Sequence, residues 1–366
     1  MSGQRFWAGK RVLVTGHTGF KGSWLSLWLT TLGAKVFGYA LEPDTEPSLF
    51  EQLGLVNDVD HLIADIRDPA AVIARVVVVR PDVVFHMAAQ PLVRRSYTDP
   101  LLTWQTNVMG TAYLLDSLRS LDGPCAAVIV TTDKVYENRE SAHAYLETDR
   151  LGGHDPYSSS KAACELAVDS WRRSFFRQDW PVRIATARAG NVIGGGDWAE
   201  DRIVPDLARS LAAGQPLVVR NPESVRPWQH VLDPLSGYMR LAEQLYSSGD
   251  AQYQSAFNFG PAAAGARPVS DLVRVALAEW PGETASPPPG TPPHEARLLT
   301  LESAKARSML GWAPRWNFRD SVRATVAWYR GVHAGQSARN LSLEDIEAYG
   351  GSISLSDAGS TSRRPE

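Results

Sequence analysis

Three glycines spaced three residues apart, near the N-terminus, constrain this chain more than any other feature. RVLVTG (11–16) reads as a short buried strand, and FKGSWLSLWLTTLGA (20–34) reads as a helix. Gly16 permits a tight turn, Gly19 lets the backbone approach a phosphate, and Gly22 allows the helix to pack closely on the strand. The helix N-terminus then directs free N–H groups at a pyrophosphate. This context predicts a dinucleotide-binding unit, with a purely structural turn as the alternative.

Strand and helix patterns alternate through the first half of the chain. Such alternation predicts an α/β fold with a doubly wound parallel sheet and right-handed crossovers. The Val-rich segment AVIARVVVVRPD (71–82) resembles a strand by propensity, but Asp68-Pro69 resembles a helix start, so we expect a helix there. Further strands are expected at 35–41, 61–68, 81–90, 126–133 and 182–190, and further helices at 107–121 and 156–175.

The composition changes after residue 190, where glycine and proline become frequent and the expected helices are shorter. We therefore expect a modified Rossmann domain at 1–190, whose sheet later segments complete, and a smaller C-terminal α/β substrate-binding lobe at 191–340. Residues 352–366 have the composition of a disordered tail. In the lobe, helices are expected at 204–213, 231–247, 269–280, 302–310 and 318–333, a strand at 217–220 and an extended surface loop at 286–293.

The composition excludes several classes of protein. A net charge of −3 without charged blocks gives no electrostatic support for nucleic-acid or membrane-surface binding. No apolar segment reaches the ~18 residues of a membrane span, and the N-terminus lacks a signal-peptide pattern. Two cysteines, Cys125 and Cys164, fit a reduced, cytoplasmic protein without a disulfide framework. No His, Cys or Asp cluster has metal-ligand spacing, so no metal site is expected.

Two groups of polar residues follow the predicted strands. Thr132, Asp133 and Lys134 stand at a strand end, and Tyr157 and Lys161 are four apart on one helix face. A lysine in that position can lower the pKa of the phenol, so that the phenolate removes a hydroxyl proton as hydride leaves the same carbon for a nicotinamide. Alone, this pair is common on protein surfaces. Together with the glycine turn it indicates dehydrogenase chemistry.

Six motifs carry a resemblance to a known family: TGHTGFKG, FHMAAQPLVRRSY, TNVMGT, TTDKVY, YSSSK and RAGNVIGGGD. They resemble the extended short-chain dehydrogenase/reductases that act on nucleotide sugars, over residues 6–333. The stretches FWAGKRVLVTGHTGFKGSWLSLWL and GGHDPYSSSKAACEL are similar to the members that remove water from CDP-glucose. The resemblance implies NAD as the cofactor, oxidation at carbon 4 of the sugar, loss of water across carbons 5 and 6, and hydride return to carbon 6. Tyr157 would take the proton of the 4-hydroxyl, and Thr132 would hydrogen-bond the 4-oxygen.

The third residue of the strand-end motif departs from that family. Its dehydratases usually have Thr-Asp-Glu there, whereas this chain has Lys134. Asp133, protonated through burial, would donate to the departing 6-hydroxyl. Lys134 could remove the carbon 5 proton if burial or Lys161 depresses its pKa, or it could stay cationic while Tyr157 takes that proton. The other readings are a turn acid for Asp133 and a solvated or structural lysine for Lys134.

The resemblance and the strand ends also suggest binding residues. NAD is favoured over NADP because no arginine follows the second strand, although the first acids there, Glu42 and Asp44, come late. Cofactor contacts are expected from Gly16, His17, Gly19, Phe20, Lys21, Gly22, Asp65, Ile66, Ala88, Ala89, Gln90, Thr106, Tyr157 and Lys161. Substrate contacts are expected from Gln90, Arg94, Asn107, Asn191, Arg202 and Arg226.

Several of these residues have a second reading. His17 could be a surface histidine, Asp65 a turn or helix-capping acid, and Asn107 a helix N-cap. Arg188 could be structural. Trp198 and Trp228 could stack on the nucleotide base or pack in the core, where Trp7, Trp24, Trp28 and Trp104 are expected.

The resemblance extends to assembly and pathway. Helices 107–121 and 156–175 carry partly apolar faces, and such helices pair between subunits in this family, so a homodimer is expected. The product would feed deoxysugars of surface polysaccharide, including lipopolysaccharide O-antigen. The alternatives are a nucleotide-sugar 4-epimerase, a dehydratase for dTDP-, GDP- or UDP-linked sugars, and a catalytically silent NAD-binding regulator. The presence of Asp133, Tyr157 and Lys161 argues against the regulator.

Overall fold

A seven-stranded sheet forms the centre of the computed structural model, which describes residues 2–141, 143–177, 180–262, 265–287 and 299–350. The strand order is β12-β7-β5-β4-β1-β2-β3, and every neighbouring pair is parallel. This confirms the predicted doubly wound α/β fold. The strands are β1 (Arg11–Thr15), β2 (Lys35–Ala40), β3 (Asp60–Ile63), β4 (Val83–His86), β5 (Cys125–Val130), β7 (Val182–Ala189) and β12 (Ala256–Phe259).

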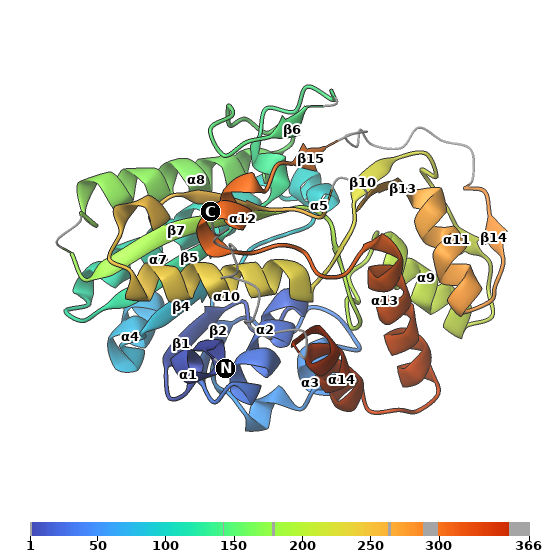
Figure 1. Ribbon diagram of the computed structural model, residues 1–366, viewed down its shortest axis with the longest axis horizontal. Coiled ribbons are helices and arrows are strands. Elements are labelled where there is room, and N and C mark those ends of the chain that lie inside the picture. Colours follow the sequence, from blue (N-terminus) through green and yellow to red (C-terminus); the bar gives the residue numbers. More distant parts are fainter. Residues whose placement is uncertain (1, 142, 178–179, 263–264, 288–298, 351–366) are drawn as a thin grey trace, which may run out of the picture.

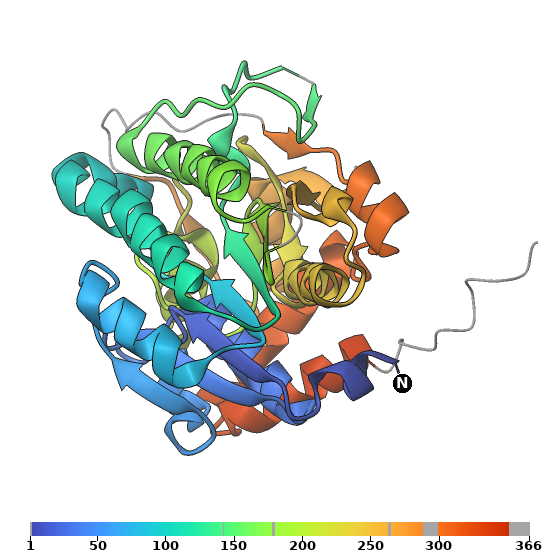
Figure 2. The same cartoon turned by 90° about the vertical axis from the view of Figure 1, so that its left-hand side faces the viewer.

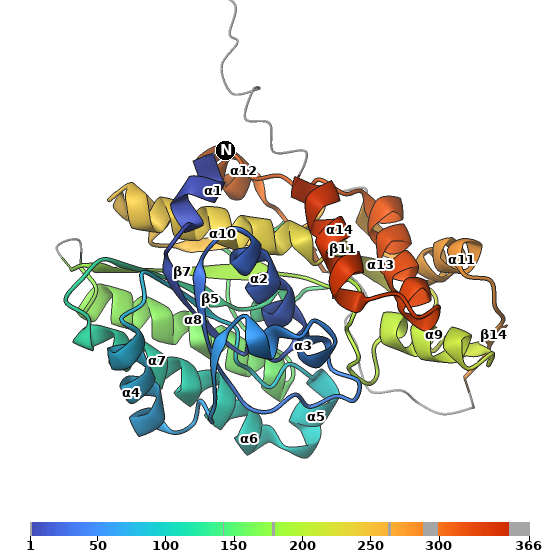
Figure 3. The same ribbon diagram turned by 90° about the horizontal axis from the view of Figure 1, so that it is seen from below.

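Helices cover both faces of this sheet (Figures 1 and 3). On one face lie α2 (Phe20–Thr31) and α10 (Leu232–Ser247), and on the other α4 (Pro69–Val79), α7 (Gly110–Ser117) and α8 (Pro156–Ser174). In Figure 2 the sheet stands between the green and teal helices and the gold α10. Val12 and Val14 of β1 pack into the core under α2 and α10, whereas Leu13 packs into the core under α4 and α7. Burial on both faces explains why the strands read as continuous apolar runs.

The Val-rich segment is a helix, as predicted. Pro69 begins α4, and the side chain of Asp68 caps it by accepting hydrogen bonds from the backbone N–H groups of Ala70 and Ala71. The helix buries Val72, Val76 and Val79 against the sheet. Capping and burial therefore outweigh the weak helix propensity of valine.

Two elements after residue 191 belong to the sheet layer. α10, expected in the second lobe, packs on the sheet and connects β7 with β12, which pairs in parallel with β7. β12 is the short segment AFNF, which was not recognised as a strand from its sequence. The expectation that later segments complete the sheet is thus met by Ala256–Phe259.

Among the remaining segments, α9 (Ile203–Ala212), α11 (Val269–Glu279), α12 (Ala304–Leu310) and α13 (Phe318–His333) agree with the predicted helices. Figure 1 shows three of these helices, α9, α11 and α13, side by side at its right, whereas α12 packs on α10 and β12. α14 (Ala338–Gly350) was not predicted and packs near α2 and α3. The expected tail and most of the expected loop at 286–293 lie outside the described residues. The short elements are α1 (Ser2–Trp7), α3 (Leu49–Gln52), α5 (Val93–Thr98), α6 (Pro100–Trp104), a π-helical turn (Gln105–Met109), β6 (Ala144–Tyr145), β8 (Val192–Ile193), β9 (Leu217–Val218), β10 (Val225–Pro227), β11 (Gln229–His230), β13 (Ala266–Pro268), β14 (Thr284–Ala285) and β15 (Thr300–Leu301).

Among the described residues, no helix has the length and apolar character that crossing a lipid bilayer requires.

Candidate active site

A cleft of about 2180 Å³ opens at the carboxyl ends of the sheet strands. Its walls come from the glycine turn, the segments after β2, β4 and β5, the start of α8, and the second lobe. Single small-molecule sites usually have volumes of roughly 300–1,000 Å³, so this cleft has room for two ligands side by side. Ligands of doubly wound sheets bind at this edge.

The glycine turn has the geometry that a pyrophosphate needs. Gly16 adopts a positive φ of 75°, and a Cβ at Gly22 would lie 2.1 Å from the carbonyl oxygen of Gly16. Gly19 is the N-cap of α2 and no side chain caps this helix, so its first N–H groups face the cleft uncapped. The residues present therefore fit a dinucleotide cofactor.

His17 does not lie where the sequence suggested. Its side chain is fully buried behind the turn, with its ring packed on Gly38 and its edge toward Phe50, and it does not line the cleft. Burial, with the nearby charges of His61 and Arg75, lowers its pKa to about 4. Both readings of its side chain, a phosphate contact and a surface histidine, are wrong, because the turn directs the ring into the core.

Asp133 is the most buried member of the strand-end group, with 1% of its surface exposed. Thr132 donates from Oγ1 to Asp133 Oδ1 over 2.9 Å, and Lys134 Nζ lies 3.2 Å from the same oxygen. Asp133 Oδ2 faces Gly190, where an added Cβ would lie 2.7 Å away. The glycine of RAGN therefore leaves the space that this carboxylate occupies. The arrangement is an acid and an amine in direct contact at the floor of the cleft.

Tyr157 and Lys161 share the inner face of α8, as their spacing predicts, and both line the cleft. Burial, together with the charges of Asp133 and Asp155, raises the pKa of Tyr157 above its ordinary value. A hydrogen bond with Thr132 and the charge of Arg202 oppose this shift without reversing it. Lys161 donates from Nζ to the carbonyl oxygen of Val130 over 3.2 Å. The groups that favour the ionised phenol in this structure are Thr132 and Arg202, and Lys161, to which the sequence assigned that role, is not among them.

Lys21 is a third lysine of the cleft. It lies in the first turn of α2, and its Nζ is 6.0 Å from the ring of Tyr238 on α10. Burial, with the charge of Arg202 and of the other two cleft lysines, lowers its pKa to about 8, although Asp133 opposes this shift. The sequence named Lys21 as a cofactor contact and gave no reason to place it near Asp133.

Asn107, in the π-helical turn, links the loop after β4 to α8 through its contacts with Gln90 and Ser160. Asn107 accepts from the backbone N–H of Gln90 over 2.8 Å and donates to its carbonyl oxygen and to Ser160 Oγ. Asn107 is buried inside the π-helical turn and does not line the cleft, so both earlier readings, N-cap and direct substrate contact, are wrong. Gln90 does line the cleft, with its side chain bound to Thr103 and Leu92.

The other predicted contacts lie on the cleft wall. Asp65 bonds its neighbour Arg67 in a tight turn, which lowers the pKa of Asp65, and Asp68 rather than Asp65 caps α4. Trp198 and Trp228 line the cleft while their ring N–H groups bond Gln52 and Arg267. The remaining lining residues from the predictions are Phe20, Ile66, Ala88, Ala89, Arg94, Thr106, Asn191, Arg202 and Arg226.

A buried ion pair lies behind Thr131 and the Tyr157–Lys161 face of α8. Arg188 Nη2 and Glu165 Oε2 are 2.8 Å apart and each side chain is 4% exposed. Glu165 also accepts hydrogen bonds from Thr131 and Thr186, so the structural reading of Arg188 is correct. Glu165 follows Lys161 by four residues on α8, and this spacing was the signal that could have identified it.

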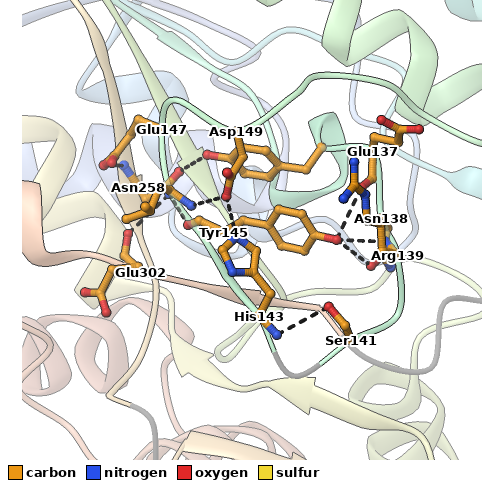
Figure 4. Close-up of polar contacts among 12 residues, drawn as sticks. Glu137, Asn138, Arg139, Ser141, His143, Tyr145, Glu147, Asp149, Asn258 and Glu302 are labelled. Atoms are coloured by element: carbon orange, nitrogen blue, oxygen red, sulfur yellow. Dashed lines mark hydrogen bonds and ion pairs between the residues drawn. The ribbon is translucent and has the colours of Figure 1, made fainter.

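One wall of the cleft, formed by residues 137–141 and 143–152, is held in place through Asn258 (Figure 4). Asn258 Nδ2 donates to the carbonyl oxygens of Tyr145 and Glu302, and its backbone N–H donates to Glu147. His143 and Asp149 contact each other over 2.6 Å within the same segment. β6 of this segment pairs with β15, so a strand from residues 300–301 fixes a wall that begins shortly after Lys134.

No group of three or more His, Cys, Asp or Glu side chains suited to a metal ion occurs in the described ranges.

The fold and the Tyr157–Lys161 pair define the class: they are those of the extended short-chain dehydrogenases/reductases. Within that class the chain belongs to the GDP-mannose 4,6-dehydratase family, whose model matches residues 13–325. The sequence is 46% identical over 354 residues to CDP-glucose 4,6-dehydratase of Salmonella typhimurium, covering 95% of this chain and 98% of that protein. It is 27% identical to a dTDP-glucose 4,6-dehydratase of Xanthomonas campestris, covering 87% and 92%.

Solved structures share the fold at low sequence identity. The UDP-glucose 4-epimerase of Thermus thermophilus in complex with NAD has a TM-score of 0.75 at 24% identity, covering 87% of this chain and 99% of that chain. The dTDP-glucose 4,6-dehydratase DesIV of Streptomyces venezuelae, with NAD bound, has a TM-score of 0.73 at 22% identity, covering 89% and 98%. Because epimerases and dehydratases match alike, the fold does not distinguish between these reactions.

Proposed function

We propose that this protein catalyses the NAD-dependent dehydration of CDP-D-glucose to CDP-4-dehydro-6-deoxy-D-glucose. The near full-length similarity to CDP-glucose 4,6-dehydratase supports the substrate. The observation that carries the reaction type is the buried Asp133 in contact with Lys134, next to Thr132 and Tyr157. Oxidation alone needs only the tyrosine, whereas removal of water also needs an acid and a base.

Tyr157 and Thr132 serve the oxidation at carbon 4. The phenolate of Tyr157 takes the proton of the 4-hydroxyl, and the contact between Thr132 and Tyr157 keeps both oxygens at one point of the cleft. NAD, when bound, would supply the acceptor and later the donor of the hydride. The uncapped N-terminus of α2 and Lys21 would hold its pyrophosphate, and Lys161 would orient its ribose.

Asp133 and Lys134 serve the loss of water. Transfer of one proton along their 3.2 Å contact converts the ion pair into a free amine and a carboxylic acid. The amine of Lys134 then removes the proton of carbon 5, which the 4-keto group acidifies. Asp133 gives its proton to the 6-oxygen, which leaves as water, and Lys134 returns a proton to carbon 5 after carbon 6 has been reduced. Lys134 thereby replaces the glutamate that dehydratases usually carry.

The second lobe supplies the positive charge for the sugar nucleotide. Arg226, Arg202 and Asn191 line the cleft on that side, and a guanidinium matches the geometry of phosphate oxygens. Arg94 faces them from the Rossmann side.

A cytoplasmic location agrees with Cys125 and Cys164, which are both buried free thiols. The product would enter the synthesis of surface-polysaccharide deoxysugars.

A homodimer is part of this proposal. Leu101, Trp104, Met109 and Leu166 expose 77%, 41%, 43% and 63% of their surfaces on α6, the π-helical turn and α8. Trp104 is therefore not a core residue, contrary to the sequence-based expectation, whereas Trp7, Trp24 and Trp28 are buried. Apolar side chains gathered on neighbouring helices are typical of subunit interfaces.

Mass spectrometry of the reaction products tests the function. The protein with NAD is incubated separately with CDP-, dTDP-, UDP- and GDP-linked glucose or mannose. We expect loss of one water from CDP-glucose alone, with no net NADH, and a loss of activity of at least ~100-fold in Tyr157→Phe. Conversion without a change of mass would identify an epimerase, and dehydration of another nucleotide sugar would overturn the substrate.

A further inference from the structure

An acidic side chain joins the two walls of the cleft at its entrance. Asp201 Oδ1 lies 3.1 Å from Arg94 Nη1, which comes from α5 on the Rossmann side. The same oxygen accepts a hydrogen bond from Arg220 Nη1, two residues after β9 in the second lobe. Arg220 also reaches Asp206 on α9 over 3.1 Å, and all four side chains line the cleft. One carboxylate oxygen therefore bridges two guanidinium groups that converge from opposite sides.

The backbone around Asp201 is fixed on both sides of the residue itself. Tyr329 donates to the carbonyl oxygen of Asp197 over 2.6 Å, and Arg202 bonds the Asp197 carboxylate over 2.8 Å. Arg209 holds the carbonyl oxygens of residues 198 and 199. Asp201 is the one non-glycine residue of this loop with a positive φ, 62°, which a residue with a Cβ adopts only at some cost. The strain is thus concentrated on the residue that carries the linking carboxylate, while its surroundings are held.

The contacts of Asp201 are of a kind that can exchange. The side chains of Arg94, Asp201 and Arg220 are 36%, 45% and 32% exposed, and ion pairs in such positions are weak. A diphosphate brings more negative charge than a carboxylate and more oxygens for the forked guanidinium donors. A diphosphate entering between the two arginines would therefore displace Asp201.

We propose that Asp201 is an internal substitute for the substrate diphosphate, and that Arg220 together with Arg94 binds that diphosphate once Asp201 has moved away. The inference rests on the proposed sugar-nucleotide function and adds to it a substrate contact, Arg220, and a competing gate residue. Asp206 keeps Arg220 at the cleft wall in both states. Asp201 lowers the affinity for every nucleoside diphosphate alike, because its carboxylate competes with the diphosphate and makes no contact with the base.

Calorimetric binding of CDP to the NAD-loaded protein tests the gate. Asp201→Asn removes the charge and keeps a side chain that tolerates positive φ. We expect CDP to bind about three- to tenfold more tightly, as the loss of two exposed ion pairs allows. Arg220→Gln should weaken CDP binding about tenfold, and Asp201→Asn should then add little in that background. UDP should show the same gain from Asp201→Asn, and cytidine none.

Glu200→Gln is the matched control, because Glu200 is an exposed neighbouring acid of the cleft wall outside the Arg94–Asp201–Arg220 contacts. If Asp201→Asn and Glu200→Gln raise the affinity for CDP equally, the effect comes from the loss of any negative charge near the cleft, and the gate is overturned. Unchanged or weaker CDP binding in Asp201→Asn would overturn it as well. Turnover of CDP-glucose is measured in parallel, so an active wild-type enzyme with an unresponsive Asp201 refutes only the gate. If the wild type does not turn over CDP-glucose but Asp201→Asn still binds CDP more tightly than the wild type does, only the proposed reaction is refuted.

Discussion

Lys134 is the residue whose replacement separates the steps of the proposed reaction. Lys134→Met should leave oxidation intact and slow the loss of water about 100-fold or more, because the amine in contact with Asp133 is gone. Reduced cofactor should then accumulate on the protein, visible by its near-ultraviolet absorbance, and exchange of the carbon 5 proton with deuterated solvent should stop.

Two further variants distinguish a base from a fixed cation at this position. Lys134→Glu should restore part of the elimination, since it recreates a base, and Lys134→Arg should not. Recovery with arginine alone would show that the positive charge matters and that Tyr157 removes the carbon 5 proton.

Lys21 makes cofactor binding depend on pH. Its pKa is about 8 in the free protein, and the anionic pyrophosphate beside it raises that value, so binding takes up a proton above pH 8. Affinity for NAD should therefore be constant below about pH 8 and fall by up to about tenfold per pH unit above it. The groups that surround Lys21 are Arg202, Asp133, Lys161 and Lys134.

Calorimetry in buffers of different ionisation enthalpy measures this proton uptake. Lys21→Gln should remove both the uptake and the slope, while Lys35→Gln, at an exposed position on β2, should keep them. A slope that survives in Lys21→Gln would assign it to another group of the cleft.

At the scale of elements, the buried pair Glu165–Arg188 joins α8 to β7 behind the cleft, and Thr131 adds a contact from the end of β5. Burial raises the pKa of Glu165, but the charge of Arg188 and hydrogen bonds from Arg188, Thr131 and Thr186 outweigh it and lower the pKa. Glu165→Gln leaves the guanidinium without a counter-charge and should reduce the free energy of unfolding by about 3–5 kcal/mol.

Denaturant unfolding provides that measurement. Arg173→Met, which breaks the exposed pair Arg173–Asp169 on the same helix, should cost less than ~1 kcal/mol. The double variant Glu165→Gln/Arg188→Met should be less destabilised than the sum of its single changes. Equal effects at the buried and exposed pairs would contradict this account.

Sequence patterns predicted elements well where local physics decides them. The glycine turn, the capped start of α4 and the inner face of α8 depend on spacing and neighbouring residues alone, and each lies where it was expected. β12 was not predicted because its four residues, AFNF, are too few to show a periodic pattern. α14 was not predicted because its apolar residues follow the helical period only weakly.

For the whole molecule, the exposed apolar side chains on α6 and α8 predict a dimer through that side, where Figure 3 places α6, α7 and α8 together. Leu101→Arg and Leu166→Arg, alone or combined, should shift the protein to monomers in size-exclusion chromatography with light scattering, since a charge in a buried interface is costly. Val78→Arg, at a 71% exposed position on α4, should leave the dimer intact. A monomeric wild type would contradict the proposal.

The sequence by itself determined the fold class, the cofactor turn and the catalytic group Thr132, Asp133, Lys134, Tyr157 and Lys161 as candidates, because these depend on short-range spacing along single elements. Only the tertiary structure decided what each polar residue touches. His17 points into the core, Asn107 joins the loop after β4 to α8, and Lys21 lies near Asp133. Asp201 lies between two arginines that are 107 and 19 residues away in the chain. Direction and partnership of a side chain depend on which distant segments pack around it, and no local pattern encodes that packing.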